Sequence, residues 1–191
     1  MNSICLFCAS SLGKDPEAAE HGRRLGRILA ENGITLVYGG ACVGVMLEAA
    51  SEVMNNGGRV VGIMPELLTS REVASNNLTE KYIVGSMAER KKMMIEKSDA
   101  FVILPGGVGT MDEFFEVVCL ESLGECRKPV ILLNTNGYYD YLWKFLRHSF
   151  EEGMLALPPE RYIALVNTPE EVIPAVNSFV LPPVPDWVKK D

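Results

Sequence analysis

The chain has 191 residues, a formal net charge of −7, 48% hydrophobic residues and 23% charged residues. The length predicts one domain over residues 1–180 with a proline-rich tail at 181–191, and the composition is typical of a soluble globular protein. The acidic balance argues against a general nucleic-acid-binding protein, which would be basic.

The N-terminus and the cysteines predict a cytoplasmic protein. The segment 1–4 has no basic residues, and its apolar run is too short for a signal peptide. No stretch is long enough to span a membrane. The odd count of five cysteines indicates reduced thiols. Cys5 and Cys8 have C-x-x-C spacing, but on a strand they would lie on opposite faces, so we expect core residues.

The first half of the chain alternates short apolar runs with helical patterns. Strands are expected at 4–8, 34–38 and 59–64, and helices at about 16–32 and 45–55. Asp15 and Pro16 are expected to be the N-cap and first residue of the first helix. The segment 65–85 is polar and less regular, with room for one short strand at 82–84.

The second half continues the alternation. Ser86 and Glu89 form a capping-box pattern that opens a helix to about residue 97. Further strands are expected at 99–104, 129–133 and 161–166, and further helices at 110–124, 138–153 and after Thr168. This order predicts a doubly wound α/β domain with one parallel sheet, a modified Rossmann fold. Ligands bind such sheets beyond the carboxyl ends of the strands.

A glycine-rich loop dominates the sequence at one of those strand ends. An apolar run leads into Pro105-Gly106-Gly107-Val108-Gly109, after which Thr110 is expected to open a helix. Free N–H groups at a helix N-terminus bind anions, and the helix dipole favours negative charge there. Glu113 and Glu116 follow one turn apart on one helix face. Together these features indicate a phosphorylated substrate with chemistry nearby.

Other interpretations of these motifs remain open from the residues alone. The loop 39–44 has Ala41 where a dinucleotide fingerprint has its second glycine, and no Walker motif is present, so NAD binding and ATP hydrolysis are weakly supported. The glycines could simply serve tight turns. Thr110 and Glu113 also fit a capping box, in which the carboxylate would bind the backbone N–H of Thr110.

A basic cluster, Arg90-Lys91-Lys92, lies in the first turns of its helix, where the dipole disfavours cations. It is either a solvated face or a group that faces a bound phosphate or ribose. Met87 and Met94 share a face with Arg90 or Lys91, which would place the cation over an apolar wall. His21 and His148 are isolated, so no metal site is expected.

The segment 105–113 resembles the PGGxGTxxE motif of the LOG (LONELY GUY) family, phosphoribohydrolases that activate cytokinins and are often mislabelled lysine decarboxylases. Three more family motifs occur in the family's order, and the resemblance covers nearly the whole chain. They are Cys8–Ser11, the loop Tyr38–Gly40 with Gly44–Met46, and Met87–Lys91. The family pattern commonly has Tyr at Val108, Glu at Asp112 and His at Ala88, and these departures put the base preference in question.

The resemblance implies hydrolysis of the N-glycosidic bond of a purine nucleoside 5′-monophosphate. The substrate would be AMP or the nucleotide of a cytokinin-type N6-substituted adenine, and the products the free base and ribose 5-phosphate. The catalytic residues would be Arg90, Glu113 and Glu116. The expected substrate-binding residues are Ser10, Gly39, Gly40, Met87, Lys91, Pro105, Gly106, Gly107, Gly109 and Thr110. The family implies a homodimer, sometimes a hexamer, with its site near the interface.

No metal or redox cofactor is needed for this reaction, and neither a nucleic acid nor a membrane is expected as a partner. Glu113 would stabilise the oxocarbenium character of the ribose or orient the attacking water. One alternative is a nucleotide or cofactor carrier of the same fold without turnover. Another is a pyridoxal-phosphate-dependent lysine decarboxylase, for which no lysine has a recognisable context.

Overall fold

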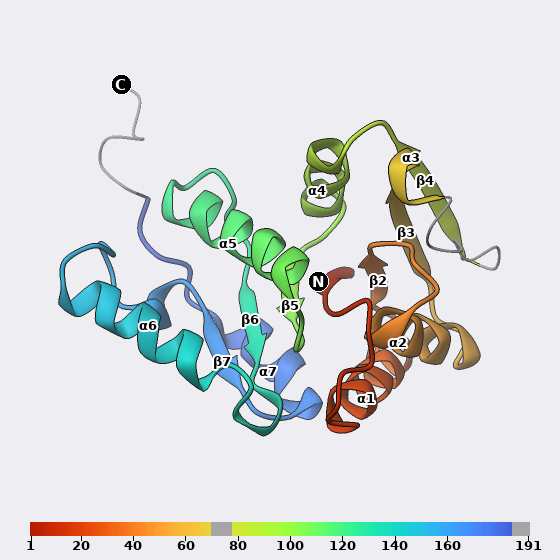
Figure 1. Cartoon of the computed structure of the whole chain (residues 1–191), viewed down its shortest axis with the longest axis horizontal. Coiled ribbons are helices and arrows are strands. Elements are labelled where there is room, and N and C mark those ends of the chain that lie inside the picture. The colour runs from red at the N-terminus through yellow and green to blue at the C-terminus, as the bar shows by residue number, and fades with distance from the viewer. Residues whose placement is uncertain (70–77, 185–191) are drawn as a thin grey trace.

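The computed structural model describes residues 1–69 and 78–184 (Figure 1). Its strands form one parallel seven-stranded sheet in the order β4-β3-β2-β1-β5-β6-β7, as predicted for a doubly wound α/β fold. The strands are β1 (Ser3–Phe7), β2 (Thr35–Tyr38), β3 (Val60–Pro65), β4 (Glu80–Val84), β5 (Ala100–Ile103), β6 (Val130–Leu133) and β7 (Ala164–Val166).

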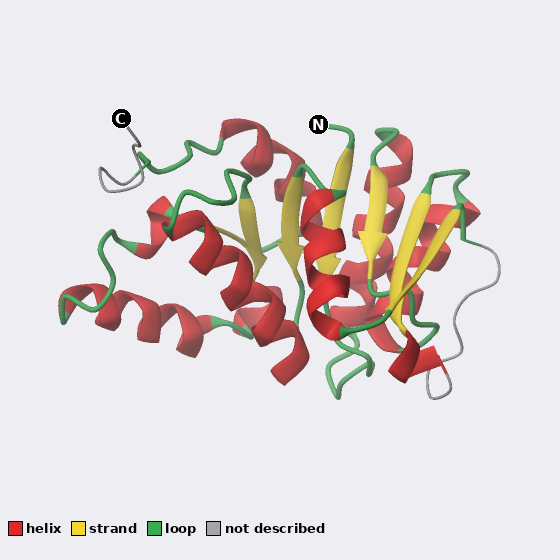
Figure 2. Ribbon diagram, turned by 90° about the horizontal axis from the view of Figure 1, so that it is seen from above, coloured by secondary structure: helices red, strands yellow, loops and turns green. Residues whose placement is uncertain are grey.

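Helices connect the strands and cover both faces of the sheet (Figure 2). The α-helices are α1 (Glu17–Glu31), α2 (Gly44–Asn55), α3 (Glu66–Thr69), α4 (Met87–Glu96), α5 (Val108–Ser122), α6 (Asp140–Glu151) and α7 (Val172–Ser178). Short 3-10 turns are η1 (Thr135–Gly137), η2 (Pro159–Arg161) and η3 (Pro169–Glu171). No helix of the described residues has the length and apolarity needed to cross a membrane.

Two apolar cores lie on opposite faces of the sheet. One packs β-strand side chains such as Leu6 against α1, α2 and α7, and the other packs Phe7 and Phe101 against α4, α5 and α6. Cys5 belongs to the second core and Cys8 to the first, so their side chains lie on opposite faces, as predicted. Buried strands need apolar residues at every position, which explains the continuous apolar runs in the sequence.

The switch point of the sheet lies between β1 and β5. The chain builds outward from β1 through β2 and β3 to β4, and then crosses back to place β5 on the other side of β1. Cys5 pairs in register with Val37 of β2 and with Phe101 of β5. The loops after β1 and β5 therefore diverge to opposite faces, which opens the crevice in which such sheets bind ligands.

Several predicted boundaries shift in the structure. Helix α5 begins at Val108, two residues before Thr110. Helix α1 begins at Glu17 with Pro16 as its N-cap, so the expected cap at Asp15 is one residue too early, although the Asp15 carboxylate accepts from the N–H of Glu17 at 2.9 Å. Strand β4 is longer than the predicted 82–84.

The structure adds one helix, shortens one predicted strand and confirms one predicted helix cap. The short helix α3 was not expected, and η2 occupies the beginning of the strand predicted at 161–166. Ser86 caps α4, accepting from the N–H of Glu89, as predicted. Parts of two predicted segments, residues 70–77 and 185–191, lie outside the described residues.

Candidate active site

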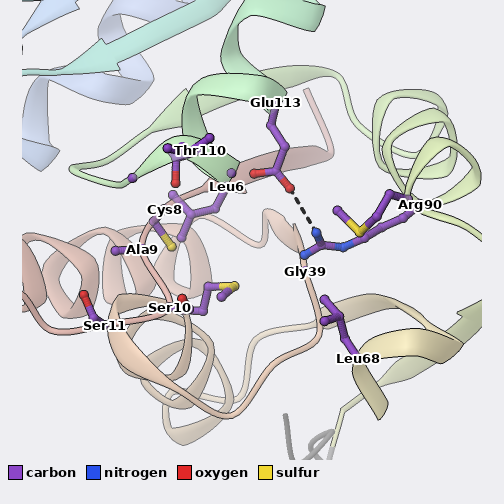
Figure 3. Close-up of a pocket in the computed structure, with 15 residues that line it drawn as sticks. Leu6, Cys8, Ala9, Ser10, Ser11, Gly39, Leu68, Arg90, Thr110 and Glu113 are labelled. Atoms are coloured by element: carbon purple, nitrogen blue, oxygen red, sulfur yellow. Dashed lines mark ion pairs between the residues drawn. The ribbon is translucent and has the colours of Figure 1, made fainter. Parts of the chain in front are cut away.

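A cavity of about 330 Å³ opens at the carboxyl ends of the central strands (Figure 3). Its walls come from β1, from the loops after β1, β2 and β5 and from α2, α3, α4 and α5, so segments distant in sequence meet there. The residues around it are Leu6, Cys8, Ala9, Ser10, Ser11, Gly39, Met46, Leu68, Met87, Arg90, Gly107, Val108, Gly109, Thr110 and Glu113.

A buried ion pair forms one wall of the cavity. Arg90 Nη1 of α4 lies 3.2 Å from Glu113 Oε1 of α5, and the two residues are only 7% and 8% exposed (Figure 3). The Arg90 Nε–H donates to the carbonyl of Ile63 in β3, at 3.1 Å. This second bond fixes the guanidinium plane, so Arg90 presents its charge to the cavity in a set orientation.

Burial gives Glu113 an unusual ionisation. Loss of water contact raises the pKa of its carboxyl from 4.5 to about 7, with smaller upward effects from the charges of Asp112 and Glu116. The cations Arg90 and Lys91 act in the opposite direction. A carboxyl that titrates near neutral pH inside a cavity is a candidate for acid–base or charge-stabilising chemistry.

The N-terminus of α5 supplies the opposite character, an anion-binding surface. Gly107 is the N-cap, and the first intrahelical bond runs from the N–H of Met111 to its carbonyl. The N–H groups of Val108, Gly109 and Thr110 precede that bond, so the helix leaves them free at the cavity. A phosphate at this position would receive these hydrogen bonds and the favourable helix dipole.

The structure decides between the two interpretations of Glu113. Because α5 begins at Val108 and has no side-chain cap bond, Thr110 lies inside the first turn and is not the N-cap. The carboxylate of Glu113 turns to Arg90 instead of the backbone of Thr110. The capping-box interpretation of this pair is therefore wrong.

At two positions around the cavity, neighbouring atoms approach the backbone so closely that only glycine fits. A Cβ at Gly39 would overlap the Arg90 guanidinium, so only glycine lets the cation reach its place. Gly44 has a φ of +57°, and a Cβ there would overlap the backbone of Ser10 and Ser11. The loop after β1 thus rests directly on the N-terminus of α2.

Most residues expected to bind substrate surround the cavity, and a minority do not. Gly40 is absent from the lining and lies against Ile63 and Met64 of β3, and Pro105 and Gly106 line an adjoining cavity of about 400 Å³. Lys91 and Glu116 form an ion pair with each other and are absent from the lining.

Sequence reasoning did not select several lining residues. Met46 and Leu68 contribute apolar wall; Met46 lay in a recognised motif, whereas nothing in the sequence marks Leu68. Burial, with the nearby Glu113 charge, holds the pKa of the Cys8 thiol well above its usual value. Cys8 is therefore a neutral part of the wall. The other lining residues outside the expected set are Leu6, Ala9, Ser11 and Val108.

Residues 1–69 and 78–184 contain no group of three or more His, Cys, Asp or Glu side chains arranged to hold a metal ion. The polar groups that face the cavity are instead one cation, one carboxyl, hydroxyls and backbone amides.

Comparisons with known proteins identify the family. A family profile described as "Possible lysine decarboxylase" matches residues 46–176. The chain is 41% identical over 180 residues to a rice protein (Oryza sativa subsp. japonica) named "Probable cytokinin riboside 5'-monophosphate phosphoribohydrolase LOGL5", covering 94% of this chain and 73% of that protein. The chain belongs to the LOG family. A second LOG relative, the "Cytokinin riboside 5'-monophosphate phosphoribohydrolase" of Rhodococcoides fascians, is 39% identical over 177 residues, covering 92% of this chain and 89% of that protein.

The LOG fold is also similar to that of proteins with other names. The Moco carrier protein of Chlamydomonas reinhardtii superposes with a TM-score of 0.70 at 21% identity, covering 93% of this chain and 96% of that one. This likeness concerns the fold alone, because the identity is low.

Proposed function

We propose that this LOG protein hydrolyses the N-glycosidic bond of a purine nucleoside 5′-monophosphate to the free base and ribose 5-phosphate. The observation that carries the proposal is that the buried Arg90–Glu113 pair and the N-terminus of α5 line the same cavity. The names of its LOG relatives support the same reaction on cytokinin nucleotides.

The phosphate would bind at the N-terminus of α5. Val108, Gly109 and Thr110 offer backbone N–H groups there, and the hydroxyls of Ser10 and Ser11 lie on the facing loop. Binding energy from the phosphate does not change during bond cleavage, so its use is to orient the ribose toward Glu113.

Bond cleavage would use the ion pair. The bond between ribose C1′ and the base nitrogen breaks, water adds its hydroxyl to C1′, and the base leaves with a proton. Ionised Glu113 would stabilise the positive charge that develops at C1′ and orient the attacking water. Arg90, fixed by Ile63 and Glu113, would hold the ribose or phosphate and favour departure of the base.

The base would lie against an apolar wall. Met46, Leu68 and Met87 surround the cavity with flexible thioether and aliphatic side chains. Such a wall accepts a purine face and an alkyl substituent, because thioether side chains adapt to irregular shapes. The preference between AMP and a prenylated nucleotide follows from these contacts.

The test is incubation with AMP and with isopentenyladenosine monophosphate, following free base and ribose 5-phosphate. Wild type should release both products in equal amounts. Glu113→Gln and Arg90→Ala should each lower kcat/KM by about 100-fold or more, since each removes a group that stabilises the transition state. Lys92→Ala is the matched control because Lys92 lies on the same helix, with its side chain 76% exposed.

Circular dichroism must show that both site variants keep the wild-type fold. Unchanged turnover in folded Glu113→Gln and Arg90→Ala would refute the roles given to these residues. Binding of AMP without base release from any purine monophosphate would instead favour the carrier function.

A homodimer is part of the proposal. Helix α5 and its C-cap Leu123 carry an exposed stripe of Val108, Phe115, Cys119 and Leu123, spaced at seven, four and four residues. Exposed apolar stripes of this kind mark association surfaces. The stripe begins at the cavity with Val108, which would place the site near the interface.

Sedimentation measures this directly. Wild type should sediment at twice the chain mass of 21.0 kDa, and Phe115→Glu should shift it toward the monomer by burying a charge in the interface. A monomeric wild type at micromolar concentration would refute the dimer.

A cytoplasmic location completes the proposal, supported by five free cysteines.

A further inference from the structure

Helices α4 and α5 are joined by two adjacent ionic contacts, only one of which faces the cavity. Arg90 pairs with Glu113 on the cavity side. The next residue of α4, Lys91, reaches Asp112 Oδ2 at 2.9 Å and also contacts the carboxylate of Glu116. The lysine side chain is 16% exposed and its partners flank Glu113 on α5, so this second contact lies directly behind the first.

From this arrangement we infer that Lys91 is a positioning residue for the proposed reaction: it clamps α4 to α5 and balances the charges beside Glu113 without touching substrate. The inference rests on the proposed function, because it assigns Lys91 a task in the same site. It differs from the sequence-based expectation, in which Lys91 binds substrate and Glu116 is catalytic.

The first part of the role is mechanical. Outside these ionic contacts α4 packs chiefly on β3 and β4, whereas Glu113 belongs to α5 on the other side of the switch point. The 3.2 Å separation of Arg90 and Glu113 therefore depends on how the two helices sit against each other. Because Lys91 of α4 is held by two carboxylates of α5, it fixes the relative position of the two helices next to Arg90 and Glu113.

The second part is electrostatic. The charged groups around Glu113 are Arg90 and Lys91 from α4 and Asp112 and Glu116 from α5. The thiols of Cys5 in β1 and of Cys8 just after β1 also lie close enough to interact with the charge of Glu113, and burial raises the pKa of both, so they remain neutral. Without the Lys91 cation, the two flanking carboxylates act uncompensated and favour the protonated form of Glu113.

The experiment measures kcat, KM and the pH profile of AMP hydrolysis in wild type and a set of variants. Lys91→Met removes the cation and keeps an unbranched apolar stem, whereas Lys91→Arg keeps the charge. Lys92→Met is the matched control on the exposed side of α4. The expected result for Lys91→Met is a fall in kcat of about fivefold at pH 7, because the acidic limb moves up by about one pH unit.

Lys91→Arg should restore most of the activity, and Lys92→Met should match wild type. The double variant Lys91→Met/Glu116→Gln should move the acidic limb back toward wild type, since it removes one uncompensated carboxylate. A rise in KM alone, with the limb unmoved and no rescue by Glu116→Gln, would overturn the inference and assign Lys91 to the substrate phosphate.

A readout without turnover separates this inference from the proposed function. Carbon-13 NMR of glutamate-labelled protein, assigned with Glu113→Gln, follows the ionisation of Glu113 directly. If wild type releases no base, the proposed function fails while the NMR titration still tests the clamp. An unchanged Glu113 titration in Lys91→Met would refute the electrostatic role.

Discussion

The ionisation of Glu113 sets the expected pH dependence of the reaction. Its carboxyl has a pKa of about 7, raised by burial from 4.5, so the group is protonated below pH 7 and charged above it. Only the charged form stabilises positive charge at C1′. We predict that kcat falls about tenfold per pH unit below pH 7. The measurement is a buffer series from pH 5 to 9, and a flat profile across pH 6 to 8 would contradict it.

The same group should also affect stability, with a definite sign. The native state binds a proton at Glu113 more tightly than the unfolded chain does, because the native pKa is the higher one. The stabilisation from that proton is present below pH 4.5 and is lost as the pH rises toward 7. Urea unfolding of Glu113→Gln should therefore show a smaller loss of stability between pH 5 and 8 than wild type. An identical slope would show that other groups dominate.

Two neighbouring tyrosines offer a matched test of how the glycine loop is held. The buried Tyr139 hydroxyl donates to the carbonyl of Leu104 at 2.6 Å, and the half-exposed Tyr138 hydroxyl donates to that of Gly106 at 2.9 Å. Tyr139→Phe should lower the free energy of unfolding by about 1 kcal/mol, since it leaves a buried carbonyl unpaired. Tyr138→Phe should lower it by less, because water can replace the Tyr138 hydroxyl. Urea unfolding measures both, and equal costs would contradict the burial argument.

Individual residues were predictable where a short local pattern determines their contacts. The Ser86 cap followed from four consecutive residues, and its hydroxyl accepts from Glu89 in the structure. Glu113 was ambiguous, because its partner Arg90 lies on a different helix that only the tertiary fold brings near. The pairing of Lys91 with Glu116 escaped the sequence for the same reason.

At the scale of one element, the N-terminus of α5 predicts separate effects on stability and on ligand binding. A Cβ at Gly109 meets no heavy atom within 4 Å, so the protein itself leaves room for a methyl group. Gly109→Ala should leave stability unchanged or raise it by up to about 1 kcal/mol through helix propensity. The methyl group would project into the space where phosphate approaches, so KM for AMP should rise about tenfold or more.

The matched variant is Gly106→Ala. A Cβ there would overlap the Thr110 side chain, so this variant should lose stability and activity together. Thermal unfolding and steady-state kinetics of both variants make the comparison. Unchanged kinetics in Gly109→Ala would show that no ligand group approaches the first turn of α5.

Elements were predictable where the apolar period is strong and less so where it weakens. The central strands read as continuous apolar runs because both faces are buried, and they appear within a few residues of the predicted positions. Edge strand β4 alternates partly buried and exposed residues up to its buried last residue, Val84, and was predicted too short. The start of α5 moved because the free first turn of a helix has no side-chain signal of its own when glycine is the cap.

For the whole molecule, the alternation of strands and helices was enough to predict a parallel, doubly wound sheet. Parallel neighbours require crossovers, and right-handed crossovers place helices on both faces. The sequence did not determine the order in which strands lie in the sheet, which depends on where the chain turns back across β1. That reversal creates the crevice. The fold was predicted from the periodicity of apolar residues, whereas the position of the site was predicted from the glycine-rich composition of the loops.

If residues 1–180 form one domain, as predicted, they should unfold cooperatively. The same central strands contribute side chains to both cores, as Leu6 and Phe7 of β1 do, so neither core can lose its strands without exposing the other. We predict a single unfolding transition in urea, with far-UV circular dichroism and tryptophan fluorescence giving one midpoint. Trp143 reports from α6 at one end of the sheet order, whereas circular dichroism reports on all the elements. Two separated midpoints would show that the sheet divides into independently folding parts.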